Sequence, residues 1–212
     1  MKIVKCNGTD ISEEGFGNTV REAAQEIAAG NLVVYPTETV YGIGADIFNE
    51  VAVKNLYLAK KRPFDMALSV AVSDKRMMEK IAVLDENADK LIKAFLPGPL
   101  TIIVEKKQDV PDMVTSMSKK VGIRIPDHPV ALEIVKRTGP IVATSANTHS
   151  HPDATEIDSA VNDLGSSVSM YIDSGPSKLK TPSTIVWIMD GEVEIVRQGA
   201  ITIKDIEEIL NA

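Results

Sequence analysis

Short apolar runs alternate with amphipathic, capped segments along most of the 212 residues, and this alternation limits the fold more than any other feature. Apolar runs bounded by Gly, Pro and Asn are typical of strands, and the segments between them carry helix start and stop signals. Strands that alternate with helices indicate an α/β fold. Asp190-Gly191 is a strong turn signal between two further strands, so we expect antiparallel pairing as well and a mixed, twisted, open sheet with helices on its faces.

Local signals set the expected bounds of these elements. Asp10–Gly17 is polar and contains glycine, which favours a loop, and Asn18 or Thr19 then caps a helix that runs to Ala29. The other expected strands are 2–6, 32–35, 67–72, 100–104, 121–126, 141–143, 170–172, 183–189 and 192–197, and the other expected helices are 49–62, 73–81, 86–95, 111–117, 129–137, 156–164 and 202–210.

Composition bounds the class of protein. Apolar residues make up 44% and charged residues 25%, which is ordinary for a soluble globular protein, and no repeat or linker divides the chain, so residues 1–212 are expected to form one domain. The net charge of −7 argues against nucleic-acid binding over the whole surface. Cys6 is the single cysteine, and neither a signal-peptide region nor a membrane span is seen, so we expect a reducing, cytoplasmic setting without membrane contact.

The stretch from Tyr35 to Gly44 places polar groups at the end of a strand. Pro36 should end the strand 32–35, and the side chains of Thr37, Glu38 and Thr39 follow at once, before a Gly-Ile-Gly segment. Open α/β sheets bind ligands at the carboxyl ends of their strands. An ordinary loop with solvated hydroxyl groups has the same composition and remains the alternative.

Other predicted strand and helix ends also carry polar groups. If they converge, they form a cationic, hydroxyl-rich pocket suited to a phosphate or a carboxylate. Each also has a plain structural explanation. The cations at 60–62 can be a solvated helix end, and the arginine at 124 can form a buried ion pair. The Ser and Asn at 145 and 147 can cap the next element, and the arginine at 197 can be a charge on an edge strand. These groups are Lys60, Lys61, Arg62, Arg124, Ser145, Asn147, Ser183, Thr184 and Arg197.

Motifs of covalent or metal catalysis are largely missing from the sequence. There is no Walker-type loop and no G-x-S-x-G elbow, and Gly42-Ile43-Gly44 lacks the rest of a dinucleotide fingerprint. His149, His151 and Asp153 make only a weak metal-site candidate, because no further ligand accompanies them. The residues therefore favour substrate positioning and charge neutralisation.

An ordered series of motifs resembles the YrdC/Sua5 family, the L-threonylcarbamoyladenylate synthases. Each motif is weak alone, but the series spans nearly the whole chain and is similar to the short form of the family, without the C-terminal domain of Sua5. The motifs are P-T-E-T-V-Y-G-I-G at 36–44, K-K-R-P at 60–63, P-G-P-L-T at 97–101, V-G-I-R-I-P at 121–126, T-S-A-N at 144–147, P-S-T-I-V at 182–186 and V-R-Q-G-A-I at 196–201.

The resemblance implies a twisted α/β sheet around a large, concave, positively charged cavity. It also implies that L-threonine, bicarbonate and ATP with Mg²⁺ give threonylcarbamoyl-AMP and pyrophosphate, for the threonylcarbamoyl (t6A) modification of adenosine 37 in tRNA by a partner transferase complex. Catalysis would rest on proximity and electrostatics, with Lys60, Arg62 and Arg124 as the leading residues.

The resemblance implies two subsites. The threonine subsite would use Thr37, Thr39, Arg124, Ser145 and Ser183, with Arg124 on the carboxylate. The ATP subsite would use Lys60, Arg62, Lys120, Asn147, Thr155 and Arg197.

Three positions depart from the family pattern. Met66 and Ala71 stand where many members have Asn and His, and Ser150 stands where the family has glycine. Two other functions therefore stay open: a paralogue that adenylates another carbamate, and a non-catalytic module that binds nucleotide or double-stranded RNA on the same fold.

Overall fold

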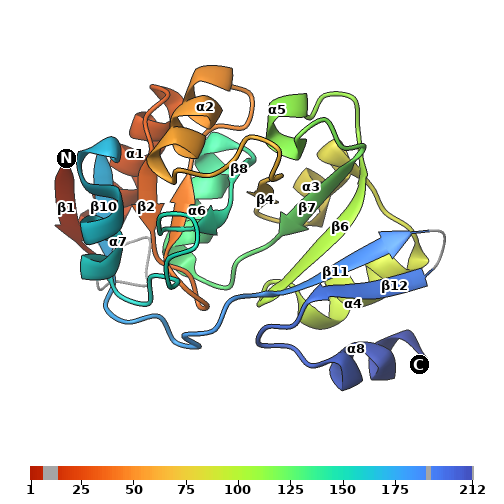
Figure 1. Ribbon diagram of the computed structural model, residues 1–212. Helices are drawn as coiled ribbons and strands as arrows, with labels where there is room; N and C mark the ends of the chain where they lie inside the picture. Colours follow the sequence, from red (N-terminus) through yellow and green to blue (C-terminus); the bar gives the residue numbers. More distant parts are fainter. Residues whose placement is uncertain (7–13, 190–191, 212) are drawn as a thin grey trace.

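The strands form two mixed sheets that lie side by side (Figure 1). The computed structural model describes residues 1–6, 14–189 and 192–211. The predicted α/β fold with mixed pairing is confirmed, although hydrogen bonding divides the expected single sheet in two. The first sheet has the order β1 (Lys2–Lys5), β10 (Met170–Asp173), β2 (Val33–Tyr35), β3 (Gly42–Gly44) and β9 (Thr144–Ser145).

The second sheet is larger and carries the predicted hairpin at its edge. Parallel pairing joins β11 to β6 and β4 to β7, whereas β6 and β7 run antiparallel. The short strand β5 (Ala82–Val83) pairs with β6 off the main path. The order is β12 (Glu192–Arg197), β11 (Thr184–Met189), β6 (Leu100–Lys106), β7 (Lys120–Arg124), β4 (Ser69–Ala71) and β8 (Ile141–Val142).

The two sheets meet at residues 141–145. β8 pairs with β4 of the second sheet, and β9 pairs with β3 of the first, with only Ala143 between them. A bridge between Asp46 and Ile141 adds a further link. The segment 174–182 also crosses from the first sheet to the second, running from β10 to β11 (Figure 1). Residues 141–145 and 174–182 therefore both connect the two sheets.

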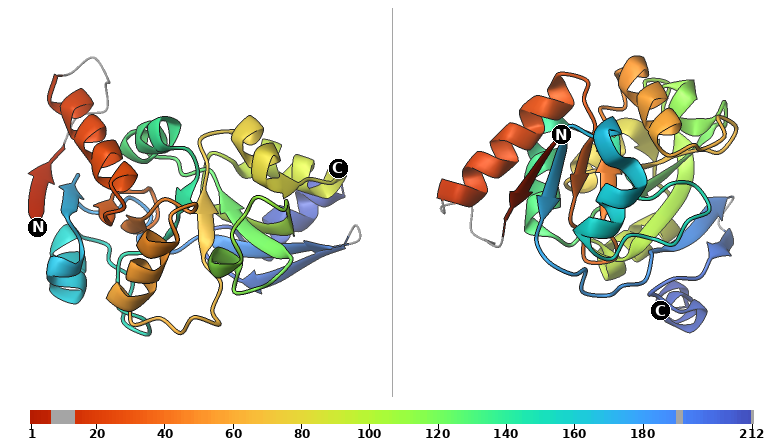
Figure 2. Two further views of the ribbon diagram at one scale, coloured as in Figure 1. Left: turned by 90° about the horizontal axis from the view of Figure 1, so that it is seen from above. Right: turned by 60° about the vertical axis from the view of Figure 1, so that its left-hand side comes forward.

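Helices cover the sheets in pairs (Figure 2). α1 (Glu14–Ala28) packs on α6 (Pro129–Thr138) beside the first sheet, and α4 (Glu86–Phe95) packs on β6 and on α8 (Ile203–Leu210). Two predicted helix starts are confirmed: Asn49 caps α2 (Glu50–Ala59), and Thr202 forms a capping box with Asp205 at the start of α8. The remaining helices are α3 (Lys75–Ile81), α5 (Asp112–Thr115), α7 (Ile157–Leu164) and the 3-10 turn η1 (Gly165–Ser167).

The predicted start of the first helix was wrong. α1 begins at Glu14, so Asn18 and Thr19 lie inside it, and the part of the expected loop before Glu14 includes residues outside the described ones. The Thr19 hydroxyl donates to the carbonyl oxygen of Gly15 at 2.9 Å, a bond made within a helical turn. Burial of Phe16 against the sheet outweighs the low helix propensity of the glycines around it.

Gly42–Gly44 was not among the expected strands, but it forms β3. The strand pairs antiparallel with β2. A Cβ atom built on Gly42 would lie 3.0 Å from the Tyr35 ring, and one on Gly44 would lie 3.0 Å from both Tyr35 and Ile141. The glycines are therefore required by the close approach of the Tyr35 ring, not by a turn.

Candidate active site

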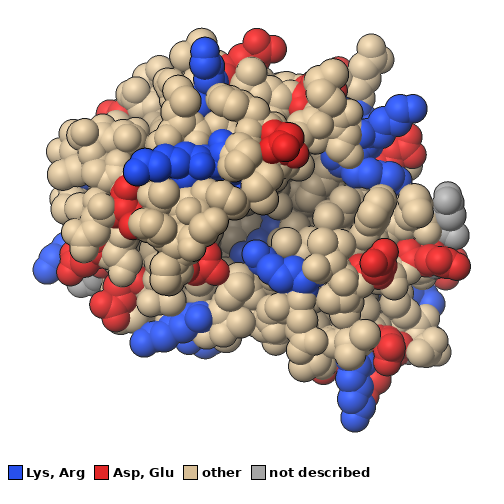
Figure 3. Space-filling view, viewed as in Figure 1, with Lys and Arg blue, Asp and Glu red and all other residues tan. Residues whose placement is uncertain are grey.

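A cavity of about 490 Å³ lies between the two sheets and is seen as the central hollow in Figure 3. The loop after β2 forms one wall, and side chains of β4, β6, β7, β11 and β12 form the other. Most of the strand-end groups singled out in the sequence are thereby brought together. The predicted site residues that line the cavity are Thr37, Thr39, Arg62, Lys120, Arg124, Ser145, Ser183 and Arg197.

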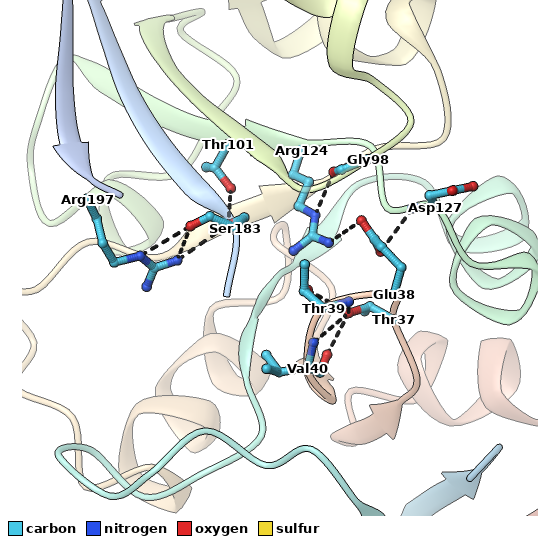
Figure 4. Close-up of polar contacts among 10 residues, drawn as sticks. All are labelled: Thr37, Glu38, Thr39, Val40, Gly98, Thr101, Arg124, Asp127, Ser183 and Arg197. Atoms are coloured by element: carbon cyan, nitrogen blue, oxygen red, sulfur yellow. Dashed lines mark hydrogen bonds and ion pairs between the residues drawn. The ribbon is translucent and has the colours of Figure 1, made fainter. Parts of the chain in front are cut away.

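Thr37 builds the loop at the cavity wall. Its hydroxyl donates to the carbonyl oxygen of Val40 at 2.6 Å and accepts from the backbone N–H groups of Thr39 and Val40 (Figure 4). The Thr37 and Thr39 hydroxyl oxygens also lie 2.9 Å apart. The loop is thus closed by Thr37, which leaves Thr39 as the better placed hydroxyl for a ligand.

Arg124 has an internal partner. Its Nη2 donates to Oε1 of Glu38 at 2.5 Å, and its Nε donates to the carbonyl oxygen of Gly98 at 3.2 Å. The side chains of Arg124 and Glu38 are 11% and 7% exposed. The ion-pair explanation for an arginine in an apolar strand is therefore confirmed. Arg124 also lines the cavity, and its contact with a ligand stays a prediction.

Ser183 and Arg197 form a second polar group across the cavity (Figure 4). Nη2 of Arg197 donates to the carbonyl oxygen of Ser183 at 2.8 Å, and the hydroxyl oxygens of Thr101 and Ser183 lie 2.9 Å apart. The neighbouring Thr184 is structural, because its buried hydroxyl donates to the carbonyl oxygen of Ile201 at 2.6 Å. The motifs around Ser183 and Arg197 are thus joined by hydrogen bonds in the folded protein.

Lys60 stands behind the cavity wall and does not line it. The ammonium group is buried and donates to the carbonyl oxygens of Ser145 and Asn147, and the carbonyl oxygen of Lys60 accepts from the N–H of His149. The pKa of Lys60 is lowered to about 8, chiefly by burial and also by nearby Arg62, whereas Asp153 and Asp163 oppose the change. Its position fits a residue that shapes the site.

Asn147 and Thr155 also lie outside the cavity lining. The side-chain N–H groups of Asn147 donate to the carbonyl oxygens of Thr148 and His151, and its buried Oδ1 has no hydrogen-bond partner among the described residues. The carbonyl oxygen of Thr155 accepts from the N–H of Ser177 at 2.9 Å. Asn147 Oδ1 is thus a spare acceptor, two residues along the chain from Ser145, which does line the cavity.

Cations outnumber carboxylates in the cavity lining. Arg62, Lys120, Arg124 and Arg197 face a single lining carboxylate of the described chain, Asp153. Burial lowers the pKa of the Arg62 and Arg197 guanidinium groups. Since Glu38 offsets the charge of Arg124, the positive character of the cavity stays a prediction.

The residues of the weak metal-site candidate, His149, His151 and Asp153, make other contacts. Nδ1 of His151 lies 2.9 Å from Oδ1 of Asp163, whose other oxygen accepts from the N–H of Thr148. Within the described ranges, no group of three His, Cys, Asp or Glu side chains is placed to hold a metal ion. Asp153, by contrast, lines the cavity.

Sequence reasoning missed several wall residues. Thr101 lies within the P-G-P-L-T motif, and its signal is a hydroxyl group at the start of a buried strand. Tyr35 and Trp187 read as strand residues without a polar role, and their place in the wall follows only from the pairing of distant strands. The Glu38–Arg124 pair joins positions 86 residues apart and had no local signal.

Comparison with known proteins places this geometry in a family. The family model for Sua5, YciO and YrdC proteins, described as telomere recombination, matches residues 25–199. The chain belongs to the Sua5/YciO/YrdC family. The sequence resemblance is therefore confirmed.

Relatives within the Sua5/YciO/YrdC family carry informative names. A Methanocaldococcus jannaschii protein, provisionally named a threonylcarbamoyl-AMP synthase, is 38% identical over 203 residues, which are 96% of this chain and 95% of the relative. The threonylcarbamoyl-AMP synthase of Bacillus subtilis is 36% identical over 95% of this chain and 60% of its own length. A crystal structure of Pyrococcus abyssi Sua5 complexed with L-threonine superposes with a TM-score of 0.92 at 33% identity, over 99% of this chain and 61% of that one.

The three departures from the Sua5/YrdC pattern occupy different places. Ala71 is buried and lines the cavity beside Arg124, its register partner on β7. Met66 is 38% exposed and outside the cavity lining, but its carbonyl oxygen accepts from Nε of Arg62. Ser150 has a φ of +67°, a conformation that glycine adopts without strain. Ala71 is thus the departure that changes the cavity wall itself.

In the part of the chain that the structure describes, no helix has the length and apolar character needed to cross a membrane.

Proposed function

We propose that this protein is an L-threonylcarbamoyl-AMP synthase. The observation that carries the proposal is one cavity lined by two separate polar groups, Arg124 with Thr39 and Arg197 with Ser183, in a chain whose relatives bear that name. Two anionic molecules held side by side are what the reaction needs. We further propose that the product serves the t6A modification of tRNA in the cytoplasm, through a partner transferase complex.

The chemistry is a sequence of two displacements. The neutral amine of threonine attacks the carbon of bicarbonate, and loss of water leaves a carbamate. A carbamate oxygen then attacks the α-phosphorus of ATP, and the bond to the β-phosphate oxygen breaks to release pyrophosphate. The protein supplies no covalent nucleophile in this scheme, so the rate enhancement comes from proximity and charge stabilisation.

The threonine subsite is assigned to the Arg124 side of the cavity. The free end of the Arg124 guanidinium would bind the carboxylate, and the hydroxyl groups of Thr39, Ser145 and Ser183 would bind the remaining polar groups. Thr37 contributes by holding the loop of Thr39. The P. abyssi complex with L-threonine, on the same fold, supports an amino-acid subsite.

The ATP subsite is assigned to the remaining cations. Arg62, Lys120 and Arg197 would neutralise the triphosphate, and the spare acceptor of Asn147 would take a hydroxyl or amine of the nucleotide near Thr155. Lys60 supports this side from behind the wall.

Mg²⁺ fits the site as a partner of the triphosphate. With one lining carboxylate among the described residues, Asp153, the chain offers no dedicated cage, which agrees with the preference of Mg²⁺ for one or two carboxylates plus phosphate oxygens. Asp153 is the residue that would hold it. When bound, the ion would offset charge on the departing pyrophosphate.

Pyrophosphate release tests the proposal. Purified protein with ATP, bicarbonate and L-threonine should release pyrophosphate, and omission of any one substrate should abolish release. Release without threonine or without bicarbonate would contradict the proposed reaction.

A paralogue with another acceptor is the second candidate, favoured by Ala71 in the cavity wall. A small side chain there leaves room that a larger acceptor could fill. Pyrophosphate release across the amino acids separates the two functions, because the synthase should prefer threonine to every other acceptor.

A further inference from the structure

Glu38 lies behind the guanidinium group of Arg124, on the side away from the cavity. Arg124 lines the cavity and Glu38 does not, although their side chains meet at 2.5 Å. Both are largely buried, with exposed fractions of 11% and 7%. The Glu38 carboxylate therefore binds Arg124 on the side of the protein interior and leaves the cavity-facing side of the guanidinium open.

The donors of Arg124 are divided between protein and cavity. Nε donates to the carbonyl oxygen of Gly98, and Nη2 donates to Glu38. None of the described residues accepts a hydrogen bond from Nη1, which points away from Glu38 on the side of Thr39 and Ser183 (Figure 4). The edge formed by Nε and Nη2 is thus already taken, and a ligand must approach the Nη1 end.

Glu38 is itself fixed at three points. Oε1 accepts from Arg124, Oε2 accepts from the N–H of Asp127 at 3.1 Å, and the backbone carbonyl oxygen accepts from the N–H of Leu179 at 2.8 Å. These contacts join the loop after β2 to the segment after β7 and to the crossing segment 174–182. A carboxylate held this way has little freedom to turn, so the guanidinium bound to it has a set orientation.

We propose that Glu38 is a positioning residue for the carboxylate subsite. It binds the Arg124 guanidinium on the side away from the cavity and fixes its rotamer. Nη1 is therefore already oriented to donate to the carboxylate of the bound amino acid. This inference rests on the proposed function, because it requires an amino-acid substrate beside Arg124. Glu38 acts through Arg124 and does not touch the substrate.

Calorimetry with L-threonine and with ATP tests the proposal. Glu38→Gln keeps the size of the side chain and an acceptor for Asp127, but it loses the charged hydrogen bond to Arg124. We expect the threonine Kd to rise about tenfold or more, as for loss of one hydrogen bond to a charged group, and the ATP Kd to change less than about threefold. Glu50→Gln, at an exposed position of α2, should change neither Kd.

A double variant shows whether the effect passes through Arg124. Glu38→Gln combined with Arg124→Ala should bind threonine no more weakly than Arg124→Ala alone, since the group being positioned is gone. If Glu38→Gln does not fold, Glu38→Asp, which keeps the charge but is one methylene shorter, takes its place in the same measurements.

The possible outcomes distinguish a failure of the Glu38 positioning role from a failure of the proposed function. Wild-type protein that binds no threonine would overturn both. Wild-type protein that binds threonine, with a Glu38 variant that binds it equally well or that loses threonine and ATP affinity alike, would overturn the positioning role alone. Additive losses in the double variant would overturn it as well.

Discussion

The ammonium group of Lys60 donates a hydrogen bond to the carbonyl oxygen of Asn147 at 2.6 Å, beneath the loop that carries two of the candidate ligand groups. A second bond goes to the carbonyl oxygen of Ser145, and the side chain is almost entirely buried. A cation at the end of α2, 85 residues before Ser145, therefore sets the path of the loop at the cavity wall. Its burial has a measurable consequence for stability.

Lys60 should make stability rise with pH above about 8. Its pKa falls from 10.5 to about 8 on folding, chiefly through burial, so between these values the unfolded chain binds more protons than the folded one. Relative to Lys60→Met, wild-type protein should gain about 1.5 kcal/mol in free energy of unfolding between pH 8 and pH 9.5, because the slope reaches about 1.4 kcal/mol per pH unit only above the folded-state pKa. Urea unfolding at the two pH values measures this difference. Lys54→Met, at an exposed position of the same helix, is the control for the loss of a lysine side chain.

Gly42 should not tolerate even one added methyl group. A Cβ at Gly42 would lie 3.0 Å from the Tyr35 ring, which is itself buried in the wall between the sheets. Gly42→Ala should lower the free energy of unfolding by about 1–3 kcal/mol through overpacking. Gly15→Ala is the matched control, because a Cβ there meets no atom within 4 Å, so the added methyl group should not lower the free energy of unfolding. Equal effects of the two changes would contradict the packing explanation.

The parts of the fold that sequence predicted are those with a local cause. α4 was expected at 86–95 and has those bounds, because Asp85 caps it and Pro97 follows. β3 was not expected because three residues, two of them glycine, carry no strand signal of their own, and the strand forms only by pairing with β2 and β9. α1 was begun too late because Gly15 and Gly17 read as loop residues.

In the candidate site, too, sequence could predict features with a local cause and could not predict contacts between distant residues. Thr39, Arg124 and Arg197 could be named from sequence, since polar groups at strand ends have a physical reason to meet. How each is held could not be named. Glu38 pairs with a residue 86 positions away, and Lys60 reaches carbonyl oxygens, which every residue has and which leave no trace in the sequence.

Loss of Arg124 should affect the binding of threonine and the binding of ATP differently. Arg124→Ala removes the guanidinium beside Thr39 and should weaken threonine binding far more than ATP binding, as measured by calorimetry. It also leaves the Glu38 carboxylate buried without its partner, which should cost about 3–5 kcal/mol of stability, so binding is measured well below the unfolding temperature. Arg137→Ala, at an exposed end of α6, serves as the control. Equal losses for threonine and ATP would refute a carboxylate role for Arg124.

Tyr41 should control the crossing segment 174–182, which we expect to cover the bound substrates. Its buried hydroxyl donates to the carbonyl oxygen of Gly175 at 2.7 Å and accepts from the N–H of Ser174 at 3.0 Å, and burial raises its pKa to about 12. Tyr41→Phe leaves both backbone groups without a partner and should cost about 1–3 kcal/mol of stability. Trypsin should then cut faster after Lys178 and Lys180, both exposed in this segment.

Ligands and a second tyrosine complete this test. ATP with threonine should slow cleavage after Lys178 in wild-type protein if the segment covers the site, because closure over bound ligands orders such segments. Tyr171→Phe removes a hydroxyl that donates to the carbonyl oxygen of Gly165 at 2.7 Å, away from the segment. It should therefore lose comparable stability without faster cleavage after Lys178. Cleavage that rises equally in both variants would mean that general loosening, not the Tyr41 tether, governs the segment, and cleavage unchanged by ligands would show that it does not cover the site.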